Sequence, residues 1–387
     1  MTDPLDPGTD VGLYVHWPYC ARICPYCDFN VVRDRGRTDE QDRLVEAILA
    51  DLAAQRARTG PRRLASVFFG GGTPSLMRPQ AVARILGAAH DLFPPASPKI
   101  EITLEANPTD AEAGRFADLA QAGINRLSMG VQALDDAALR FLGRDHSADE
   151  ALRAVGLARC AFERLSIDLI YARPDQRPES WATELKAALA LGFEHVSPYQ
   201  LTIEPTTAFG RALARGTLVP PDEDRAAALY ETTQTVLSGA GFEAYEVSNH
   251  ARGAAARSIH NLHVWRGGDY LGLGPGAHGR LTLEGARTAT VAHRRIGDYV
   301  QGVSAGTPWV ERDRLSTADA AEERLLLGLR TVEGAPASLL SDLGLSIETG
   351  PATDLIADGF LHLTAGRLIA TAKGRPVLDG VLKALLT

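Results

Sequence analysis

Short runs of β-branched and aromatic residues alternate with longer amphipathic stretches over the first half of the chain. The amphipathic stretches, such as DEQDRLVEAILADLAAQRA and ESWATELKAALALG, predict helices. Strands that alternate with helices are typical of right-handed βαβ units and a parallel sheet. The pattern alone leaves an open sheet and a partial (β/α)6 barrel as alternatives. The six predicted strands cover residues 11–17, 66–71, 100–106, 125–131, 164–171 and 195–201.

The pattern changes after the sixth strand. A helix is predicted over residues 222–240, and a segment rich in glycine and histidine follows at 250–280. From about residue 310 the pattern is helical, and LIADGFLHLTAGRLIATAKGRPVLDGVLKALL predicts a helix, a hairpin and a helix, as in a winged-helix module. The predicted parts are a disordered N-terminus (1–10), a barrel (11–250), a connecting segment (251–309) and a winged-helix-like domain (310–387).

Composition and charge narrow the class of protein. The chain has 387 residues and a net charge of -8, and residues 310–387 carry 11 acids and 8 bases. This balance argues against binding of nucleic acid. The first residues lack the basic start of a secretory signal, and no apolar run approaches the roughly 20 residues that span a bilayer. We therefore expect a cytoplasmic protein.

Three of the four cysteines lie within eight positions, in YCARICPYCDFN (residues 19–30). Cys20, Cys24 and Cys27 follow the first predicted strand with the spacing C-x-x-x-C-x-x-C. A tight cysteine group in a reducing compartment more often binds metal or does chemistry than forms disulfides. Zinc would require a fourth ligand nearby, which is missing. A [4Fe–4S] cluster normally takes four thiolates, so three leave one iron open for a chelating small molecule.

The fourth cysteine, Cys160, lies alone in the helical stretch EALRAVGLARCAFERL. We expect it to be a small buried apolar residue.

The cysteine loop resembles the cluster motif of radical S-adenosylmethionine (SAM) proteins. That resemblance implies a partial (β/α)6 barrel with a [4Fe–4S] cluster on Cys20, Cys24 and Cys27. It also implies that SAM chelates the fourth iron, and that the reduced cluster cleaves SAM to a 5′-deoxyadenosyl radical. The GGTP stretch of that family is matched by Gly71, Gly72 and Thr73.

Other motifs match the coproporphyrinogen dehydrogenase-like branch of that superfamily: LEANP, SMGVQ, LGRDH and IDLIY. Carboxylates in these motifs suit ribose hydroxyls, and Arg144 suits the SAM carboxylate as a charge-assisted donor. Surface salt bridges or a tight turn would explain any one of these residues alone. The resemblance carries SAM binding over to Tyr14, Tyr26, Gly71, Gly72, Thr73, Glu105, Gln132, Arg144 and Asp168.

Two related types share this resemblance. Oxygen-independent coproporphyrinogen III oxidases decarboxylate two propionates, whereas HemW-type heme chaperones bind and deliver heme. The oxidase motif continues C-x-x-x-C-x-x-C-x-C behind a long N-terminal arm, but here Phe29 stands at the fourth position and thirteen residues precede Tyr14. HNLHVW (260–265) resembles the chaperone signature HNxxYW, with Val264 in place of tyrosine. The resemblance therefore implies the chaperone, with the radical SAM decarboxylase as the alternative.

His260 is the candidate heme ligand, because neutral imidazole is a good axial ligand of heme iron. Four histidines (250, 260, 263 and 278) lie within thirty residues, and an ordinary hydrogen-bonded histidine is the alternative for each. No catalytic residue is assigned. The implied partners are heme, an acceptor protein at a membrane or elsewhere, an electron donor if SAM is cleaved, and a second copy in a homodimer. A DNA-binding redox switch in the C-terminal module is a weaker alternative.

Overall fold

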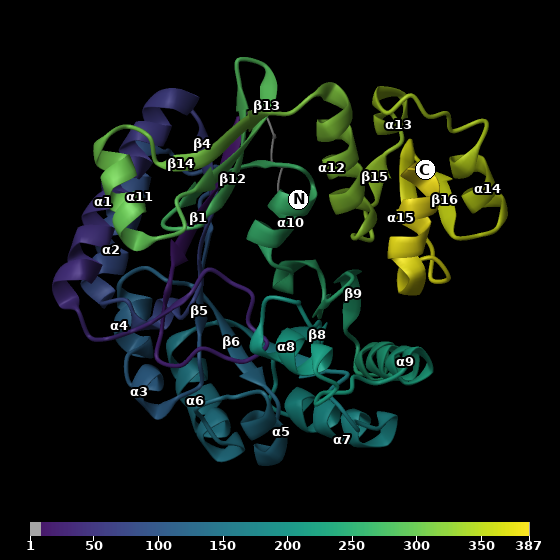
Figure 1. The fold of residues 1–387 in the computed structure, drawn as a ribbon, viewed down its shortest axis with the longest axis horizontal. Coiled ribbons are helices and arrows are strands. Elements are labelled where there is room, and N and C mark those ends of the chain that lie inside the picture. Colours follow the sequence, from purple (N-terminus) through teal and green to yellow (C-terminus); the bar gives the residue numbers. More distant parts are fainter. Residues whose placement is uncertain (1–8, 387) are drawn as a thin grey trace.

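Six parallel strands form the centre of one twelve-stranded sheet in the computed structural model, which describes residues 9–386. The strands follow an open arc, in the order β14-β13-β12-β11-β1-β4-β5-β6-β7-β8-β10-β9 (Figure 1). All six predicted strands are confirmed, and the fold is the expected partial barrel. These six central strands are β1 (Asp10–Trp17), β4 (Arg63–Gly71), β5 (Glu101–Ala106), β6 (Arg126–Gln132), β7 (Arg164–Tyr171) and β8 (His195–Gln200).

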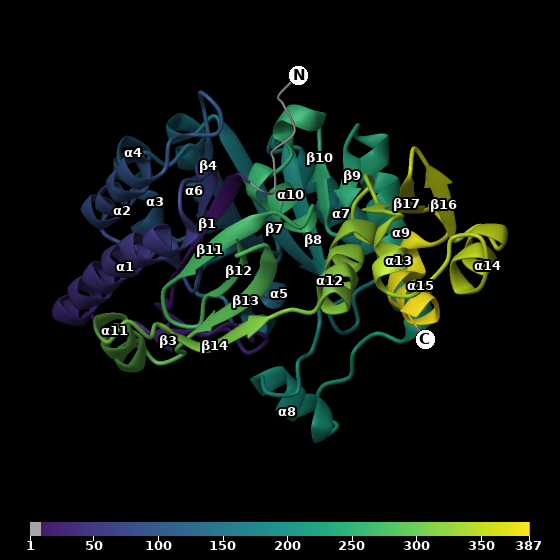
Figure 2. The same cartoon turned by 90° about the horizontal axis from the view of Figure 1, so that it is seen from above.

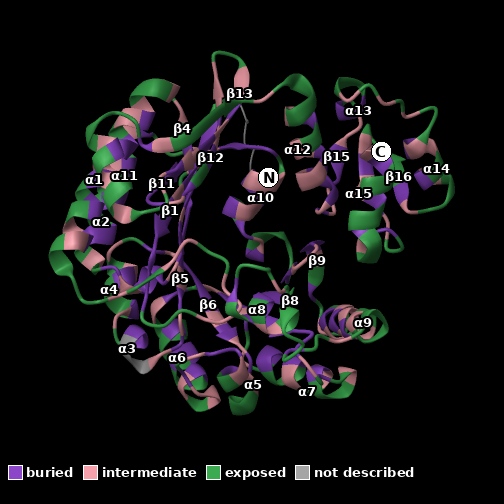
Figure 3. Cartoon of the chain, in the orientation of Figure 1, coloured by how far each residue is buried: buried purple, intermediate pink, exposed green. Residues whose placement is uncertain are grey.

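Helices cover the outer side of the arc, and their residues include buried as well as exposed ones (Figure 3). Apolar residues that point outward from the strands, such as Leu104, Leu127 and Ile167, are completely buried beneath them. Trp181 joins two of these helices, because its Nε1 donates to Thr233 Oγ1 at 2.8 Å. The helices are α1 (Thr38–Thr59), α2 (Pro79–Leu92), α3 (Asp110–Ala113), α4 (Phe116–Gln121), α5 (Asp136–Phe141), α6 (Ala148–Ala161), α7 (Pro178–Leu189) and α9 (Glu223–Gly239).

The prediction for Cys160 was wrong, because its side chain is exposed. The buried side of α6 is formed by Ala151, Ala154, Val155 and Ala158. Cys160 lies outside that spacing, on the solvent side of the last turn.

The inner side of the parallel strands is polar. Successive strand residues point to opposite faces, so Glu105, Ser128 and Asp168 face inward where their neighbours face the helices. Register places Glu105 beside Ser128, and Ser128 beside Ser166 on the next strand. The barrel interior therefore holds rows of buried polar side chains where an apolar filling is common.

Residues 251–314 extend the sheet next to β1. Helix α10 (Ile259–Trp265) lies on the inner side of the arc (Figure 1). Strand β11 (Asp269–Leu273) pairs parallel to β1, and β12 (His278–Leu283), β13 (Ala286–Ala292) and β14 (Trp309–Arg314) continue antiparallel. The predicted connecting segment thus contributes strands to the main sheet. Helix α11 (Ile296–Ser304) packs on α1, while β9 (Glu243–Glu246) and β10 (Asn249–Ala251) end the opposite edge.

The C-terminal part forms a second, smaller core beside the barrel (Figure 2). The predicted order of helix, hairpin and helix is confirmed in α14, β16, β17 and α15. The ion pair of Arg266 with Glu333, at 2.6 Å, ties this part to the end of α10. Its elements are α12 (Thr317–Leu329), β15 (Ala335–Pro336), α13 (Leu339–Asp342), α14 (Pro351–Ala357), β16 (Leu361–Thr364), β17 (Arg367–Ala370) and α15 (Leu378–Leu386).

The predicted disordered N-terminus lies outside the described residues as far as residue 8, and Asp10 already belongs to β1. Among the described residues, no helix combines the length and hydropathy required to cross a bilayer.

Candidate functional site

The cysteine loop is fastened to the C-terminal ends of β1 and β4. The backbone N–H groups of Gly72 and Thr73 donate to the carbonyls of Trp17 (2.7 Å) and Tyr19 (2.8 Å). Two short strands, β2 (Tyr19–Cys20) and β3 (Val32–Arg33), pair in parallel and close the base of the loop. Helix α8 (Ala208–Ala214) holds its tip, where the Phe209 N–H donates to the Pro25 carbonyl at 2.9 Å. The loop therefore lies over the mouth of the barrel.

A pocket of about 390 Å³ opens at this mouth, and Cys20, Cys24 and Cys27 all line it. Burial raises the pKa of Cys20 to about 11 and the pKa of Cys27 above its usual value, so metal binding must displace thiol protons. In the described part of the chain, no three His, Cys, Asp or Glu side chains converge on one ion. The thiolates of an iron–sulfur cluster bind different irons and do not need to converge.

The same pocket gathers nearly all the residues predicted to bind SAM. Two buried atoms in it, Gln132 Oε1 and Arg144 Nε, have no hydrogen-bond partner within the described residues. Gln132 ends β6 in the left-handed region, with φ 66°. Unpaired buried polar atoms are costly, so the pocket is suited to a polar ligand that would satisfy them. The predicted residues in the lining are Tyr26, Gly71, Gly72, Thr73, Glu105, Gln132, Arg144 and Asp168.

Arg144 is fixed beside the cysteines by several contacts. Its Nη1 donates to Cys24 Sγ at 3.3 Å, and its Nη2 donates to the Gly130 carbonyl at 3.0 Å and to Asn107 Oδ1. Asn107 in turn donates to Thr73 Oγ1 at 3.0 Å. Asn107 was not among the residues predicted from the sequence, although it lies two positions after Glu105 at the same strand end.

Two carboxyl groups line the pocket deeper in the barrel. Burial and the nearby Asp168 raise the pKa of Glu105 to about 8, and burial raises the pKa of Asp168 to about 6. Glu105 Oε2 accepts the Gly71 N–H at 3.2 Å, and Asp168 Oδ2 accepts the Ser128 hydroxyl at 3.2 Å. Carboxyl groups in this state favour a ligand that brings hydroxyl donors or positive charge.

Gly71 has a structural reason to be glycine as well. Its φ is +107°, and an added Cβ would lie 2.5 Å from the His16 ring. His16 Nε2 donates to the Asn30 carbonyl at 2.8 Å, so its Nδ1 accepts the Tyr14 hydroxyl at 3.0 Å. The glycine thus allows the end of β4 to pack against this chain of hydrogen bonds.

A second cavity, of about 470 Å³, lies on the other side of Gly71 and Glu105, which line both. Tyr14 belongs to this cavity and lies outside the lining of the cysteine pocket. It shares this cavity with Gly71 and Glu105, two of the other residues predicted to bind SAM. Aromatic, imidazole and arginine side chains dominate the wall, which includes Tyr14, His16, Phe29, Phe68, His260, Val264, Trp265, Tyr270, His278 and Arg294.

His260 lies in the wall of the second cavity, on α10. Its Nδ1 is 2.9 Å from Ser66 Oγ, and burial lowers its pKa to about 3, so the ring is neutral. His263 does not line this cavity, and its Nε2 donates to the Asp269 carbonyl at 2.6 Å. His250 is buried against Gln234. Of the four clustered histidines, His260 and His278 therefore line the cavity.

Comparisons with known proteins agree with this geometry. A model of the radical SAM superfamily matches residues 14–187, and a model of the HemN C-terminal domain matches residues 315–377. The heme chaperone HemW of Escherichia coli (strain K12) is 36% identical over 97% of this chain and 98% of that protein. The chain belongs to the HemW family of the radical SAM superfamily.

Another relative of this HemW-family chain is radical S-adenosyl methionine domain-containing protein 1, mitochondrial, of Mus musculus. It is 41% identical over 99% of this chain and 89% of that protein. The solved structure of coproporphyrinogen III oxidase (HemN) from Escherichia coli shares the fold, with a TM-score of 0.81 at 22% identity, over 99% of this chain and 91% of that one. Membership of the superfamily implies a [4Fe–4S] cluster and SAM.

We expect the cysteine pocket to be the site of the cluster. Replacing Cys20, Cys24 or Cys27 by alanine should abolish incorporation of iron and sulfide, because the remaining two thiolates leave two irons without protein ligands. Iron and sulfide content after anaerobic reconstitution measures this. The matched control is Cys160→Ala, which should keep the cluster because Cys160 lies exposed on α6. A cluster that survives loss of one loop cysteine would contradict the assignment.

We also expect Glu105 to make the SAM-free protein less stable as pH rises. Its pKa is about 8 in the folded chain and ordinarily 4.5, so between these values the folded state keeps a proton that the unfolded state has released. The free energy of unfolding therefore falls across this window. Glu105→Gln should flatten the fall in urea unfolding measured from pH 5 to pH 9. The exposed control Glu179→Gln should follow the wild type, and equal slopes in all three proteins would contradict the expectation.

Proposed function

We propose that this protein is a heme chaperone that carries a [4Fe–4S] cluster on Cys20, Cys24 and Cys27. SAM would occupy the rest of the cysteine pocket, and heme would occupy the second cavity before transfer to an acceptor protein. The observation that carries this proposal is the adjacency of the two cavities, which share Gly71 and Glu105.

Chemical fit supports SAM in the cysteine pocket. Arg144 offers a guanidinium beside Cys24, where a carboxylate bound to the open iron would lie. Glu105 and Asp168 offer acceptors for ribose hydroxyls, and Gln132 offers an unpaired amide oxygen. When bound, the cluster and SAM supply radical chemistry. The residues of this chain bind SAM, orient it and enclose it at the mouth of the barrel.

The second cavity is suited to a flat aromatic ligand with anionic edges. Phe68, Trp265 and Tyr270 offer ring surfaces, and Arg294 offers a cation for a propionate. His260 offers a neutral imidazole whose other nitrogen is held by Ser66, an arrangement that is usual for histidines that bind metals. Val264 lines the same wall in place of the family tyrosine. The aromatic surface of the cavity therefore comes from the neighbouring side chains.

Location and partners complete the proposal. We infer a cytoplasmic location for this chain, whereas the mouse relative is named mitochondrial. The acceptor would be a protein that takes heme from the second cavity, and the chain would act alone or as a homodimer. An electron donor would be required only if SAM is cleaved.

A radical decarboxylase of coproporphyrinogen III is the second candidate. The complete polar lining of the cysteine pocket favours it, because a carrier of heme has no evident requirement for Glu105 and Asp168 together. Phe29 argues against it, since its exposed ring stands where the oxidase motif has a fourth cysteine. Anaerobic incubation of the reduced protein with coproporphyrinogen III and SAM separates the two functions. Formation of protoporphyrinogen would overturn the carrier proposal.

Titration of hemin into the anaerobically reconstituted protein tests the heme site. We expect saturable one-to-one binding in the Soret band that is weakened strongly by His260→Ala. Ser66→Ala should weaken binding by about tenfold, because the imidazole loses the partner that orients it.

His263→Gln is the matched control for the hemin titration. It replaces the other imidazole of α10, which lies outside the cavity, with a side chain that can still donate to the Asp269 carbonyl. This variant should bind hemin as the wild type does. Absence of saturable binding by the wild type would contradict the proposed function, and equal affinities of wild type and His260→Ala would exclude His260 as the ligand.

A further inference from the structure

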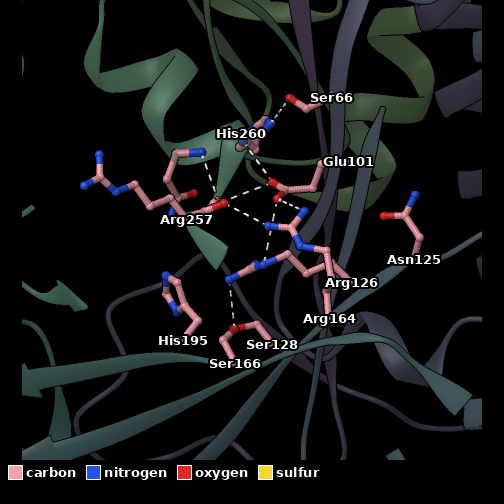
Figure 4. Close-up of polar contacts among 12 residues, drawn as sticks. Ser66, Glu101, Asn125, Arg126, Ser128, Arg164, Ser166, His195, Arg257 and His260 are labelled. Atoms are coloured by element: carbon pink, nitrogen blue, oxygen red, sulfur yellow. Dashed lines mark hydrogen bonds and ion pairs between the residues drawn. The ribbon is translucent and has the colours of Figure 1, made fainter. Parts of the chain in front are cut away.

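A buried carboxylate holds the first turn of α10, the helix that carries His260. Glu101 Oε1 accepts the His260 N–H at 2.9 Å and the hydroxyl of Ser258, the N-cap of α10, at 3.4 Å (Figure 4). Because Glu101 begins β5, this contact fixes the height of His260 against the barrel wall. A negative charge also favours the first turn of a helix electrostatically.

Two arginines keep Glu101 ionised. Arg164 Nη1 lies 2.7 Å and Arg126 Nε 3.9 Å from Glu101 Oε2, and the carboxylate is completely buried. Burial would raise the pKa of Glu101, but the two guanidinium groups and the N–H groups of α10 lower it. Arg164 also donates to the Arg257 carbonyl at 2.8 Å, just before α10. The start of the helix is therefore fixed to the barrel by charge-assisted contacts.

The same network continues to the cysteine pocket. Arg126 Nη2 donates to Ser166 Oγ at 3.0 Å, and Ser166 Oγ lies 2.8 Å from Ser128 Oγ. Ser128 lies 3.2 Å from Asp168 Oδ2, in the wall predicted to bind SAM. A chain of buried contacts thus joins the helix of the heme site to the pocket of SAM, through Glu101, Arg126, Ser166, Ser128 and Asp168.

This chain has two hydrogen arrangements. A guanidinium only donates, so when Asp168 is ionised Ser166 donates to Ser128 and Ser128 donates to Asp168. When Asp168 is protonated it can donate to Ser128 instead, and the hydroxyls of Ser128 and Ser166 are then no longer held in one direction. Ionised Asp168 therefore fixes the direction of these hydrogen bonds, with the Ser166 proton pointing away from Arg126 and its oxygen accepting from that guanidinium.

We propose that the chain from Asp168 to Glu101 couples the two sites, so that SAM in the cysteine pocket tightens heme binding at His260. The inference rests on the proposed function and adds a regulatory link to it. SAM carries a positive sulfonium, and positive charge near a carboxyl favours its ionised form. That form stabilises the arrangement in which Glu101 holds α10. Coupling between binding sites is reciprocal, so heme must tighten SAM binding by the same factor.

Ser166→Ala tests the coupling. Ser166 is fully buried, and it is not among the described residues that line either cavity. Hemin affinity is measured with and without saturating SAM on anaerobically reconstituted protein. We expect SAM to tighten hemin binding on the order of tenfold in the wild type. In Ser166→Ala this factor should fall close to one, while the affinity for each ligand alone stays within about twofold of the wild type.

Thr103→Val is the matched control. Thr103 lies on the same inner face, is completely buried, and its hydroxyl has no hydrogen-bond partner within the described residues. The variant therefore removes an interior hydroxyl outside the chain and should keep the factor of the wild type. Wild-type coupling in Ser166→Ala, or its loss in Thr103→Val, would overturn the proposal.

The reciprocal measurement requires no variant. Hemin must tighten SAM binding to the wild type by the factor that SAM gives for hemin, and a factor of one in the wild type would overturn the coupling. That result would leave the proposed function intact if hemin binding still depends on His260. Absence of any saturable hemin binding would instead overturn the proposed function, and the coupling with it.

Discussion

One buried guanidinium, that of Arg126, interacts with carboxyl groups in two parts of the barrel interior, near α10 and near the mouth. It lowers the pKa of Glu101 at the start of α10. It also partly offsets the rise in pKa that burial causes at Glu105 and Asp168 at the mouth. Removing one partner of a buried ion pair typically costs about 3–5 kcal/mol. The charges below α10 and around the cysteine pocket are therefore compensated partly by the same cation.

The two cavities also share a physical wall. Gly71 and Glu105 end adjacent strands, and their opposite sides face the cysteine pocket and the cavity of His260. Gly71 allows His16 and Tyr14 to pack on the far side, where a side chain would collide with the imidazole. The parallel sheet brings both sites to neighbouring strands, as is typical of ligand sites at the carboxyl ends of strands. In the proposed chaperone, a redox-active cofactor and heme would thus lie side by side.

Local sequence patterns predicted the helices and strands better than they predicted the polar contacts inside the barrel. Alternation of strands and helices predicted all six central strands, and cysteine spacing predicted residues that line one pocket. Tyr14 was grouped with the SAM residues by motif, and β1 directs it to the second cavity, whose wall also includes Gly71 and Glu105. Glu101, Arg126 and Ser166 were missed because each pairs across strands far apart in sequence. The sequence signal that could have identified these residues was a polar residue at every second strand position. Cys160 was predicted to be buried but is exposed, because residue type alone does not determine which side of a helix a residue occupies.

Anomalous diffraction at the iron edge, from anaerobic crystals of the reconstituted protein with hemin, tests directly whether a cluster and heme occupy the two adjacent cavities. Iron from the cluster and iron from heme then appear as separate positions in one map. We expect a cluster enclosed by Cys20, Cys24 and Cys27, and a heme iron bonded to His260 Nε2 across the wall formed by Gly71 and Glu105. Heme iron on the outer surface, or at the mouth of the cysteine pocket, would contradict this expectation.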